Sequence, residues 1–322
     1  MRVLITGASG FAGSWLCRQC AEAGDEVVAL SRRGIVREGC GQGIAVDLRD
    51  GAAVREAVRA CAPDLVYHLA SLTSVGRSWE APSRTLGDND AITVSVLEAL
   101  RQVAGGAPVV WVSSCEVYGA PEVLPATEDL PLRPANPYAV SKAAGEMLVR
   151  VYADAYGLEI AVARPFSHSG PGQLPIFLLS NLASQAAEGR RAGASRLEVV
   201  TGNPETRRDF TDVRDVVRAY RMLAEALVSG RPSAAGGTFN VGSGRSVSAA
   251  EQVSMLAELV SPIEVEHVVD PARVRATEVM DLRADPARLR ALTGWEPTIP
   301  LRQTMGDTIA WWERHQERIA AA

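Results

Sequence analysis

A tyrosine and a lysine four positions apart could carry proton-transfer chemistry. Tyr138 and Lys142 stand at helical spacing, so both side chains lie on one face of a helix predicted near residues 138–156. The ammonium group of Lys142 can lower the pKa of the Tyr138 phenol and can hold a ribose hydroxyl. Tyr138 is then able to exchange a proton with a carbonyl or an alcohol. Ser114 follows a predicted strand over residues 109–113 and can offer its hydroxyl to the same oxygen.

A glycine-rich segment near the start of the chain predicts a dinucleotide site. Residues 6–13 read Thr-Gly-Ala-Ser-Gly-Phe-Ala-Gly and connect an apolar strand over residues 2–5 to a predicted helix over residues 13–23. Glycines there permit a tight turn and a close approach of the backbone to a pyrophosphate, which faces the free N–H groups of the helix start. We therefore expect Gly7, Gly10, Phe11 and Ala12 to bind a cofactor.

The end of the second predicted strand distinguishes between the two nicotinamide cofactors. An acidic residue there would bind the ribose hydroxyls of NAD, but this chain has Ser31, Arg32 and Arg33. Two guanidinium groups suit a 2′-phosphate, because they donate charge-assisted hydrogen bonds. The alternative is a solvated basic pair on a surface loop. The sequence thus favours NADP(H), with NAD as the alternative.

The elements that must position these residues alternate between strands and helices. Apolar runs over residues 2–5, 26–30, 65–69, 109–113 and 159–163 suit buried parallel strands, and helical patterns lie between them. This order predicts an α/β fold with a doubly wound parallel sheet of the Rossmann type. We expect a cofactor domain over residues 1–165, to which some later segments return. A smaller, mixed α/β substrate domain is expected over residues 166–322, with helices at 175–188, 215–228, 248–260 and 303–317 and strands at 197–201 and 238–241.

The composition excludes several classes of protein. The 322 residues carry a net charge of −5 with 47% hydrophobic residues, so neither nucleic-acid binding nor attachment to an anionic membrane is expected. The chain enters its first strand directly after Met-Arg, which argues against a signal peptide and for a cytoplasmic protein. Five cysteines are expected to be free thiols. The histidines show no metal-ligand spacing, so we expect no metal site.

Longer motifs, taken in their order, resemble those of the extended short-chain dehydrogenase/reductases. They are the glycine-rich segment, His68-Leu69-Ala70, residues 113–119 (Ser-Ser-Cys-Glu-Val-Tyr-Gly), the Tyr138–Lys142 pair, and residues 164–173, 207–217 and 293–297. The resemblance covers nearly the whole chain and points to the nucleotide-sugar branch that holds GDP-mannose 4,6-dehydratases and GDP-4-keto-6-deoxy-mannose reductases. It implies a nicotinamide cofactor on the first domain and a nucleotide sugar, GDP-linked by this resemblance, on the second.

The resemblance also assigns roles to individual residues. It makes Ser114, Tyr138 and Lys142 the catalytic set, with Glu116 at the position of a catalytic base in dehydratases. Cys115 departs from the Asp or Ser usual there, which weakens the dehydratase interpretation. Further cofactor contacts are expected from Asp47, Leu48, Leu69, Ala70, Ser71 and Pro165, and substrate contacts from Arg77, Ser114, Ser167, Arg208, Arg275 and Glu278.

The sequence allows three enzymatic activities, because the same active-site geometry could perform each of them. A reductase would deliver hydride from NADPH to C4 of a 4-keto-6-deoxy nucleotide sugar. A 4,6-dehydratase would oxidise C4 transiently and use Glu116 as the base at C5, and an epimerase would invert a sugar carbon. A non-catalytic NADP-binding protein is disfavoured, because Tyr138 and Lys142 are both present. Helices near residues 89–103 and 138–156 are expected to pair across a homodimer, as they do in relatives.

Overall fold

A large parallel sheet organises the first half of the molecule. A computed structural model describes residues 1–36, 39–103, 106–274 and 278–315. Its seven-stranded sheet has the order β10-β6-β5-β4-β1-β2-β3, and every neighbouring pair is parallel. The strands are β1 (Arg2–Thr6), β2 (Glu26–Ser31), β3 (Gln42–Ala45), β4 (Leu65–His68), β5 (Val109–Val112), β6 (Ile160–Pro165) and β10 (Thr238–Val241). The predicted doubly wound fold is therefore confirmed.

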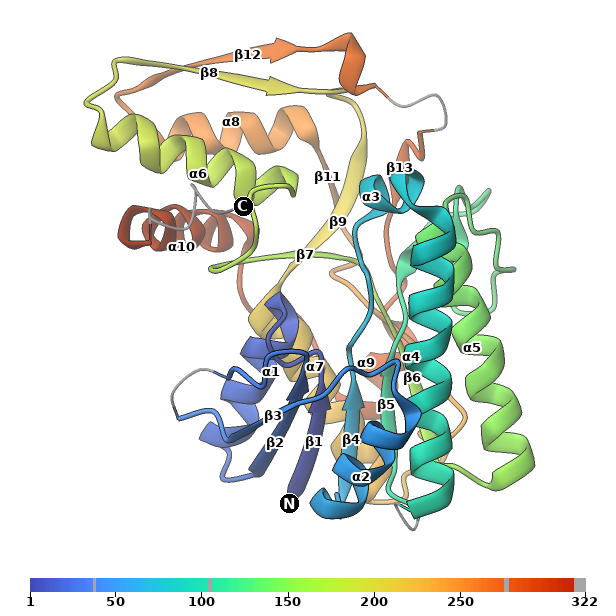
Figure 1. The fold of residues 1–322 in the computed structure, drawn as a ribbon. Coiled ribbons are helices and arrows are strands. Elements are labelled where there is room, and N and C mark those ends of the chain that lie inside the picture. Colours follow the sequence, from blue (N-terminus) through green and yellow to red (C-terminus); the bar gives the residue numbers. More distant parts are fainter. Residues whose placement is uncertain (37–38, 104–105, 275–277, 316–322) are drawn as a thin grey trace.

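Helices cover both faces of this sheet (Figure 1). Successive strand residues alternate between two apolar clusters, so that Val3 and Ile5 contribute to one and Leu4 to the other. The first cluster is closed by α1 (Phe11–Glu22), α7 (Val213–Val228) and α9 (Ala287–Thr293). The second is closed by α2 (Gly51–Cys61), α4 (Pro82–Val103) and α5 (Pro137–Tyr156). Burial on both faces explains why these strands read as continuous apolar runs.

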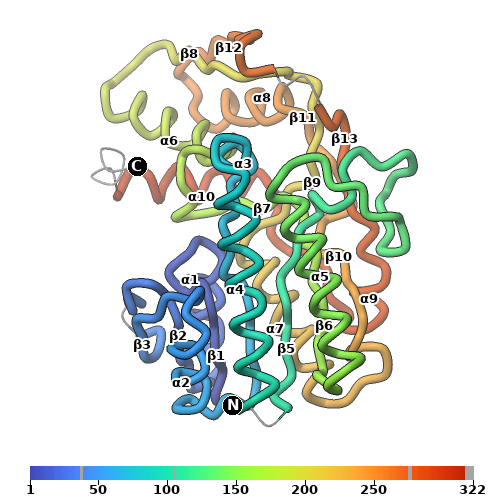
Figure 2. The backbone as a smooth tube through the Cα atoms, turned by 45° about the vertical axis from the view of Figure 1, so that its right-hand side comes forward, coloured from blue at the N-terminus to red at the C-terminus, as the bar shows by residue number. Residues whose placement is uncertain are grey.

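The second half forms a smaller unit beyond the carboxyl ends of the strands (Figures 1 and 2). Helices α6 (Leu178–Arg191), α8 (Ala249–Val260) and α10 (Leu301–Arg314) share an apolar core with a two-stranded sheet of β8 (Arg196–Thr201) and β12 (Glu264–Val269). A second small sheet contains β7 (Ser167–Ser169), β9 (Arg207–Asp212), β11 (Ser246–Ser248) and β13 (Asp281–Leu282). Although β10, α7 and α9 come late in the chain, they pack with the large sheet. The division at residue 165 remains a prediction.

Two short regular elements lie in segments for which no helix or strand was predicted. The segment after residue 166 contains β7, because its backbone pairs with β9 from Ser167 opposite Phe210 to Ser169 opposite Asp212. The other is helix α3 (Val75–Glu80), which Ser74 caps by accepting a hydrogen bond from the backbone N–H of Arg77. No helix among the described residues has the length and apolar character needed to cross a membrane.

Candidate active site

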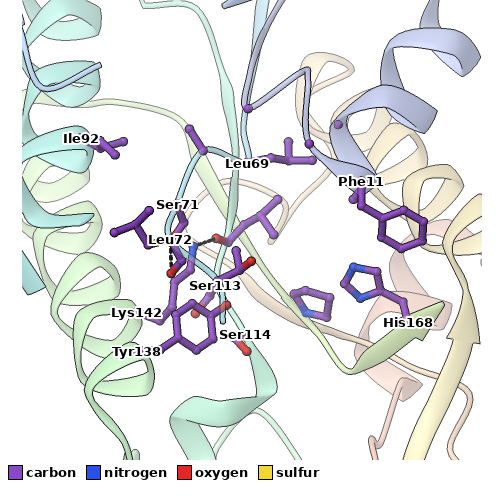
Figure 3. A pocket seen from close by; sticks show the side chains of 18 of the residues that line it. Phe11, Leu69, Ser71, Leu72, Ile92, Ser113, Ser114, Tyr138, Lys142 and His168 are labelled. Atoms are coloured by element: carbon purple, nitrogen blue, oxygen red, sulfur yellow. Dashed lines mark hydrogen bonds between the residues drawn. The ribbon is translucent and has the colours of Figure 1, made fainter. Parts of the chain in front are cut away.

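A cavity of about 520 Å³ lies at the carboxyl ends of the parallel strands, where doubly wound sheets bind ligands. Figure 3 shows Ser113, Ser114, Tyr138 and Lys142 on one side of it and Phe11 with His168 on the other. Most of the residues predicted from the sequence line this cavity. They are Gly7, Gly10, Phe11, Ala12, Ser31, Arg32, Asp47, Leu48, Leu69, Ala70, Ser71, Ser114, Glu116, Tyr138, Lys142, Pro165 and Ser167.

The glycine-rich turn has room only for glycine at two positions. Gly7 has a φ of +71°, and a Cβ there would stand 2.8 Å from the backbone N of Ala70. A Cβ on Gly13 would stand 2.2 Å from the carbonyl oxygen of Gly7. Helix α1 begins after Gly10 without a side-chain cap, so its first N–H groups face the cavity. This cradle fits the pyrophosphate of a dinucleotide.

The far end of the cavity carries a hydrogen-bonded group of charges. Arg32 lines the cavity and is exposed, whereas the exposed Arg33 does not line it. Arg49, which sequence analysis missed, also lines it and binds Asp47 (Nη2–Oδ2, 2.6 Å) and Asp88 (Nη1–Oδ1, 3.2 Å). The hydrogen bond from Arg49 lowers the pKa of the Asp47 carboxyl to about 2. In the sequence, the two-residue spacing of Asp47 and Arg49 could have indicated this ion pair.

Two buried hydroxyls along the cavity have no hydrogen-bond partner among the described residues. They are the Oγ of Ser31, at the end of β2, and the phenol oxygen of Tyr220, on α7. Tyr220 is 0% exposed, and burial raises its pKa. A buried hydroxyl without a partner is costly, so each of these two is suited to meet a polar group of a bound molecule. Nothing in the sequence pattern around Tyr220 indicated this position.

The start of α5 presents the predicted tyrosine and lysine to the cavity. The side chain of Asn136 caps the helix by accepting from the backbone N–H of Ala139, and Pro137 occupies its first turn. Burial raises the pKa of the Tyr138 phenol, while the nearby Ser114 hydroxyl acts in the opposite direction. The Nζ of Lys142 donates to the carbonyl oxygen of Val112 at 2.8 Å rather than to Tyr138. Burial lowers the pKa of Lys142 to about 8.

Glu116 and Cys115 occupy the cavity wall beside these residues. The carboxylate of Glu116 accepts a hydrogen bond from the Nδ2 of Asn136 at 2.9 Å, which fixes it near the start of α5. Cys115 is buried, and burial raises its pKa well above the usual value, with the charge of Glu116 as the next cause. All five cysteines are buried and free. Among the described residues, no cluster of His, Cys, Asp or Glu is arranged to hold a metal ion.

The side of the cavity that belongs to the second half is largely aromatic and apolar. His168 stacks on Phe11, with ring centroids 6.0 Å apart, and its Nδ1 lies 3.0 Å from the carbonyl oxygen of Phe166. Burial lowers the pKa of His168, which favours a neutral imidazole. The sequence did not predict these contacts or those of Gln173, Phe177, Leu178 and Phe210.

Several residues predicted to bind substrate stand away from this wall. Arg77 is exposed on α3, and the Nη1 of Arg208 donates to the carbonyl oxygens of Arg207 and Val279. Glu278 accepts a hydrogen bond from Asn203. Arg77, Arg208 and Glu278 do not line the cavity, and Arg275 lies outside the described residues. Their assignment to the substrate remains a prediction.

The sheet, the glycine cradle and the Tyr138–Lys142 pair together define an NAD(P)-dependent oxidoreductase-type enzyme of the extended short-chain dehydrogenase/reductase class. The family model for GDP-mannose 4,6 dehydratase matches residues 4–308. The chain therefore belongs to the GDP-mannose 4,6-dehydratase family.

Known relatives include a reductase and an epimerase. The chain is 40% identical to GDP-6-deoxy-D-mannose reductase of Pseudomonas aeruginosa over 254 residues, which is 78% of this chain and 81% of that protein. It is 31% identical to UDP-glucose 4-epimerase of Mycolicibacterium smegmatis, covering 98% of this chain and 100% of that one. The solved structure of RMD from Pseudomonas aeruginosa with NADPH matches with a TM-score of 0.83, at 34% identity and over 98% of this chain and 100% of that one.

Proposed function

We propose that the protein is an NADPH-dependent reductase that converts the C4 keto group of a GDP-linked 4-keto-6-deoxy sugar to a hydroxyl. One observation carries this proposal: Ser114, Tyr138 and Lys142 line the same cavity as the glycine-rich turn, in a chain 40% identical to a GDP-6-deoxy-D-mannose reductase. The Gly7 turn and the unpartnered hydroxyls of Ser31 and Tyr220 fit an elongated polar cofactor.

The roles of the lining residues follow from their chemistry. Gly7, Gly10, Phe11 and Ala12 bind the pyrophosphate, and Ser31 and Arg32 bind the 2′-phosphate. Arg33, the other predicted phosphate ligand, does not line the cavity and adds only its charge nearby. The other predicted cofactor contacts hold the adenine and the nicotinamide ribose; they are Asp47, Leu48, Leu69, Ala70, Ser71 and Pro165. NADPH supplies the hydride that C4 receives. These assignments also allow NAD to bind in the same cavity, without the contacts to the 2′-phosphate.

Proton transfer belongs to the protein. Ser114 donates a hydrogen bond to the keto oxygen, and Tyr138 gives its phenolic proton to that oxygen as hydride reaches the carbon. The hydroxyl product then carries one hydrogen from the cofactor and one from Tyr138, which is reprotonated from solvent. The Lys142 ammonium holds a ribose hydroxyl and stabilises the negative charge that Tyr138 develops. Ser167, Arg77, Arg208, Arg275 and Glu278 are assigned to the nucleotide-sugar substrate.

A 4,6-dehydratase is the second candidate, and the position of Glu116 favours it. The carboxylate lines the cavity, and Asn136 holds it beside Tyr138. In that reaction Glu116 would take the C5 proton while water leaves C6. An epimerase is the third candidate and has relatives of 31% identity.

Product analysis with two substrates separates these activities. GDP-4-keto-6-deoxy-mannose is offered with NADPH, and GDP-mannose is offered without added reductant. Consumption of NADPH with the keto sugar supports the reductase, and NMR of the product gives its C4 configuration. Formation of a 4-keto sugar from GDP-mannose would replace the proposal with the dehydratase. Inactivity on both substrates would refute the guanine assignment. The same two sugars are then tested as their UDP-linked and dTDP-linked forms.

The protein is further proposed to form a homodimer through α4 and α5. Val140, Met147 and Val151 share one face of α5 and are 41%, 62% and 58% exposed, and Val94 on the adjacent α4 is 36% exposed. Such an apolar stripe suits a second copy of the same two helices. Light scattering of wild-type protein is expected to give a dimer, and Met147→Asp a monomer.

We assign the enzyme to the cytoplasm, where its free thiols stay reduced.

A further inference from the structure

Lys142 and Glu146 are one helical turn apart but do not pair. Residues at this spacing on a helix are neighbours, and a lysine and a glutamate placed so ordinarily attract each other. Both side chains are buried, and residue exposure is 5% for Lys142 and 1% for Glu146. The Nζ of Lys142 nevertheless donates to the carbonyl oxygen of Val112 and lies 5.2 Å from the ring centre of Trp111. Something else must therefore hold the Glu146 carboxylate.

Arg164 on β6 holds that carboxylate in a bidentate ion pair. Its Nε donates to Oε1 of Glu146 at 2.9 Å and its Nη2 donates to Oε2 at 2.6 Å. The hydroxyl of Ser113 donates to the same carboxylate. Both partners of the ion pair have side chains that are only 1% exposed. A planar guanidinium matches a carboxylate in this way, so the geometry fixes the orientation of Glu146 as well as its charge.

Arg164 is itself fixed from other parts of the fold. Its Nη1 donates to the phenol oxygen of Tyr118 at 2.8 Å and to the carbonyl oxygen of Glu128 at 3.1 Å. Tyr118 in turn donates to Asn240 on β10 at 2.7 Å. The guanidinium therefore cannot follow a movement of α5 without breaking hydrogen bonds to two further segments.

We propose that Arg164 is a positioning residue for the active site: it holds the Glu146 carboxylate away from Lys142, so that the Lys142 ammonium remains at the cavity and free to bind the cofactor ribose. Without Arg164, Glu146 would be an unpaired buried carboxylate one turn from a buried ammonium, and the two would pair. Lys142 would then be drawn along the helix and away from the Val112 carbonyl. The proposal rests on the proposed function, which gives Lys142 its role.

The charged groups around Lys142 determine whether each substitution raises or lowers the pKa of Lys142. The charged and titratable groups that interact with Lys142 are Glu146, one turn away on its own helix, and His68 at the end of β4. Tyr138 stands one turn before it on the same helix, and Arg164 on β6 acts on it through Glu146. His68 is neutral, because burial and the charge of Lys142 lower its pKa to about 3. Burial lowers the pKa of Lys142, and Glu146 raises it. Removal of Glu146 should therefore lower the pKa of Lys142, and removal of Arg164 should raise it.

The chain offers a direct measurement, because Lys142 is its only lysine. Protein grown with ¹³C,¹⁵N-labelled lysine carries one labelled side chain, and its Cε chemical shift against pH reports the protonation of Lys142 alone. Glu146→Gln is expected to lower the midpoint by about one pH unit, and Arg164→Met is expected to raise it by a similar amount. A charge within a few ångströms of a titratable group shifts its pKa by about this much. Glu22→Gln, which removes an exposed partner of Arg18, is the matched control and should leave the midpoint unchanged.

Opposite shifts in the two variants support the proposal, since general loosening of the fold would move both midpoints up toward the value of free lysine. Shifts in the same direction, or unchanged midpoints in folded variants, would overturn it. Ser113→Ala removes a hydrogen bond to Glu146 without removing charge, so it is expected to give a smaller upward shift. This variant replaces Arg164→Met if the latter does not fold. The measurement needs no substrate, so it stays informative even if the reductase assay fails.

Discussion

Replacement of Arg32 by alanine should weaken the preference for NADPH over NADH. The sequence predicted that two neighbouring arginines at the end of β2 bind the 2′-phosphate, but only Arg32 lines the cavity. Arg49 is also present there, yet its guanidinium already binds Asp47 and Asp88. A phosphate contact from Arg49 would have to give up those bonds. Arg32 is thus expected to contribute the larger part of the recognition.

The expected magnitude follows from the exposure of the side chain. A hydrogen bond to a charged group contributes about 1.5–3 kcal/mol, and an exposed guanidinium belongs at the lower end of that range. A loss of about 1.5 kcal/mol corresponds to a roughly tenfold rise in the dissociation constant. NADH lacks the 2′-phosphate, so its affinity should not change.

Arg33→Ala is the matched control, because it removes the same charge from the next position. Arg33 does not line the cavity, and a surface substitution of this kind changes free energies by about 0.5 kcal/mol or less, which is about twofold in affinity. Fluorescence titration of both reduced cofactors against wild-type, Arg32→Ala and Arg33→Ala protein gives the ratio of affinities. An unchanged ratio in Arg32→Ala, or an equal loss in both variants, would refute the assignment of the phosphate to Arg32.

Three further predictions concern the chemistry of the site. Tyr138→Phe should lower kcat by about 10²- to 10⁴-fold while the NADPH dissociation constant stays within twofold, because only the proton donor is lost; a variant with wild-type turnover would exclude Tyr138 from that role. Tyr220→Phe should weaken NADPH binding about fivefold without loss of stability, since its buried hydroxyl has no partner within the described part of the chain; calorimetry measures the binding and thermal unfolding the stability, and unchanged or tighter binding would contradict the prediction. The reductase rate should fall as pH rises through about 8, because Lys142 loses its proton there while burial keeps Tyr138 protonated; a pH profile of kcat/KM that is flat from 7 to 9 would contradict it.

Much of the fold followed from the sequence because the large sheet is buried on both faces. Strands β1 and β5 contain runs of buried apolar residues that need burial on both faces of a sheet, and the prediction located both strands within one or two residues. The strands that were missed are β3, at the edge of the large sheet, and most strands of the smaller sheets. For example, β9 has the sequence Arg-Arg-Asp-Phe-Thr-Asp, in which charges pair with neighbouring segments instead of facing a core. Its strand structure depends on β7, β11 and β13, which are distant in sequence.

The candidate site was predictable where function constrains short motifs and not where it depends on distant contacts. The glycine turn and the Tyr138–Lys142 pair are local patterns with a direct physical meaning. Glu146 stands four residues after Lys142, so the sequence could have raised the question of an ion pair. It could not have shown that Arg164, on a different strand, takes the carboxylate instead. Tyr220 likewise becomes a candidate only when α7 packs beneath the cavity.

The environment of Glu116 bears on the choice between reduction and dehydration. Loss of water from C6 requires a base at C5 and a second group that gives a proton to the leaving hydroxyl. Cys115 stands beside Glu116, but burial raises its pKa well above the usual value, so it is a poor acid near neutral pH. Burial also raises the pKa of Tyr138, whose proton is directed at the C4 oxygen in the proposed reaction. Reduction needs only this one proton transfer, whereas dehydration needs a second donor that Cys115 supplies badly. Under the proposed reductase function, Glu116 serves as an acceptor for Asn136 and not as the base of an elimination.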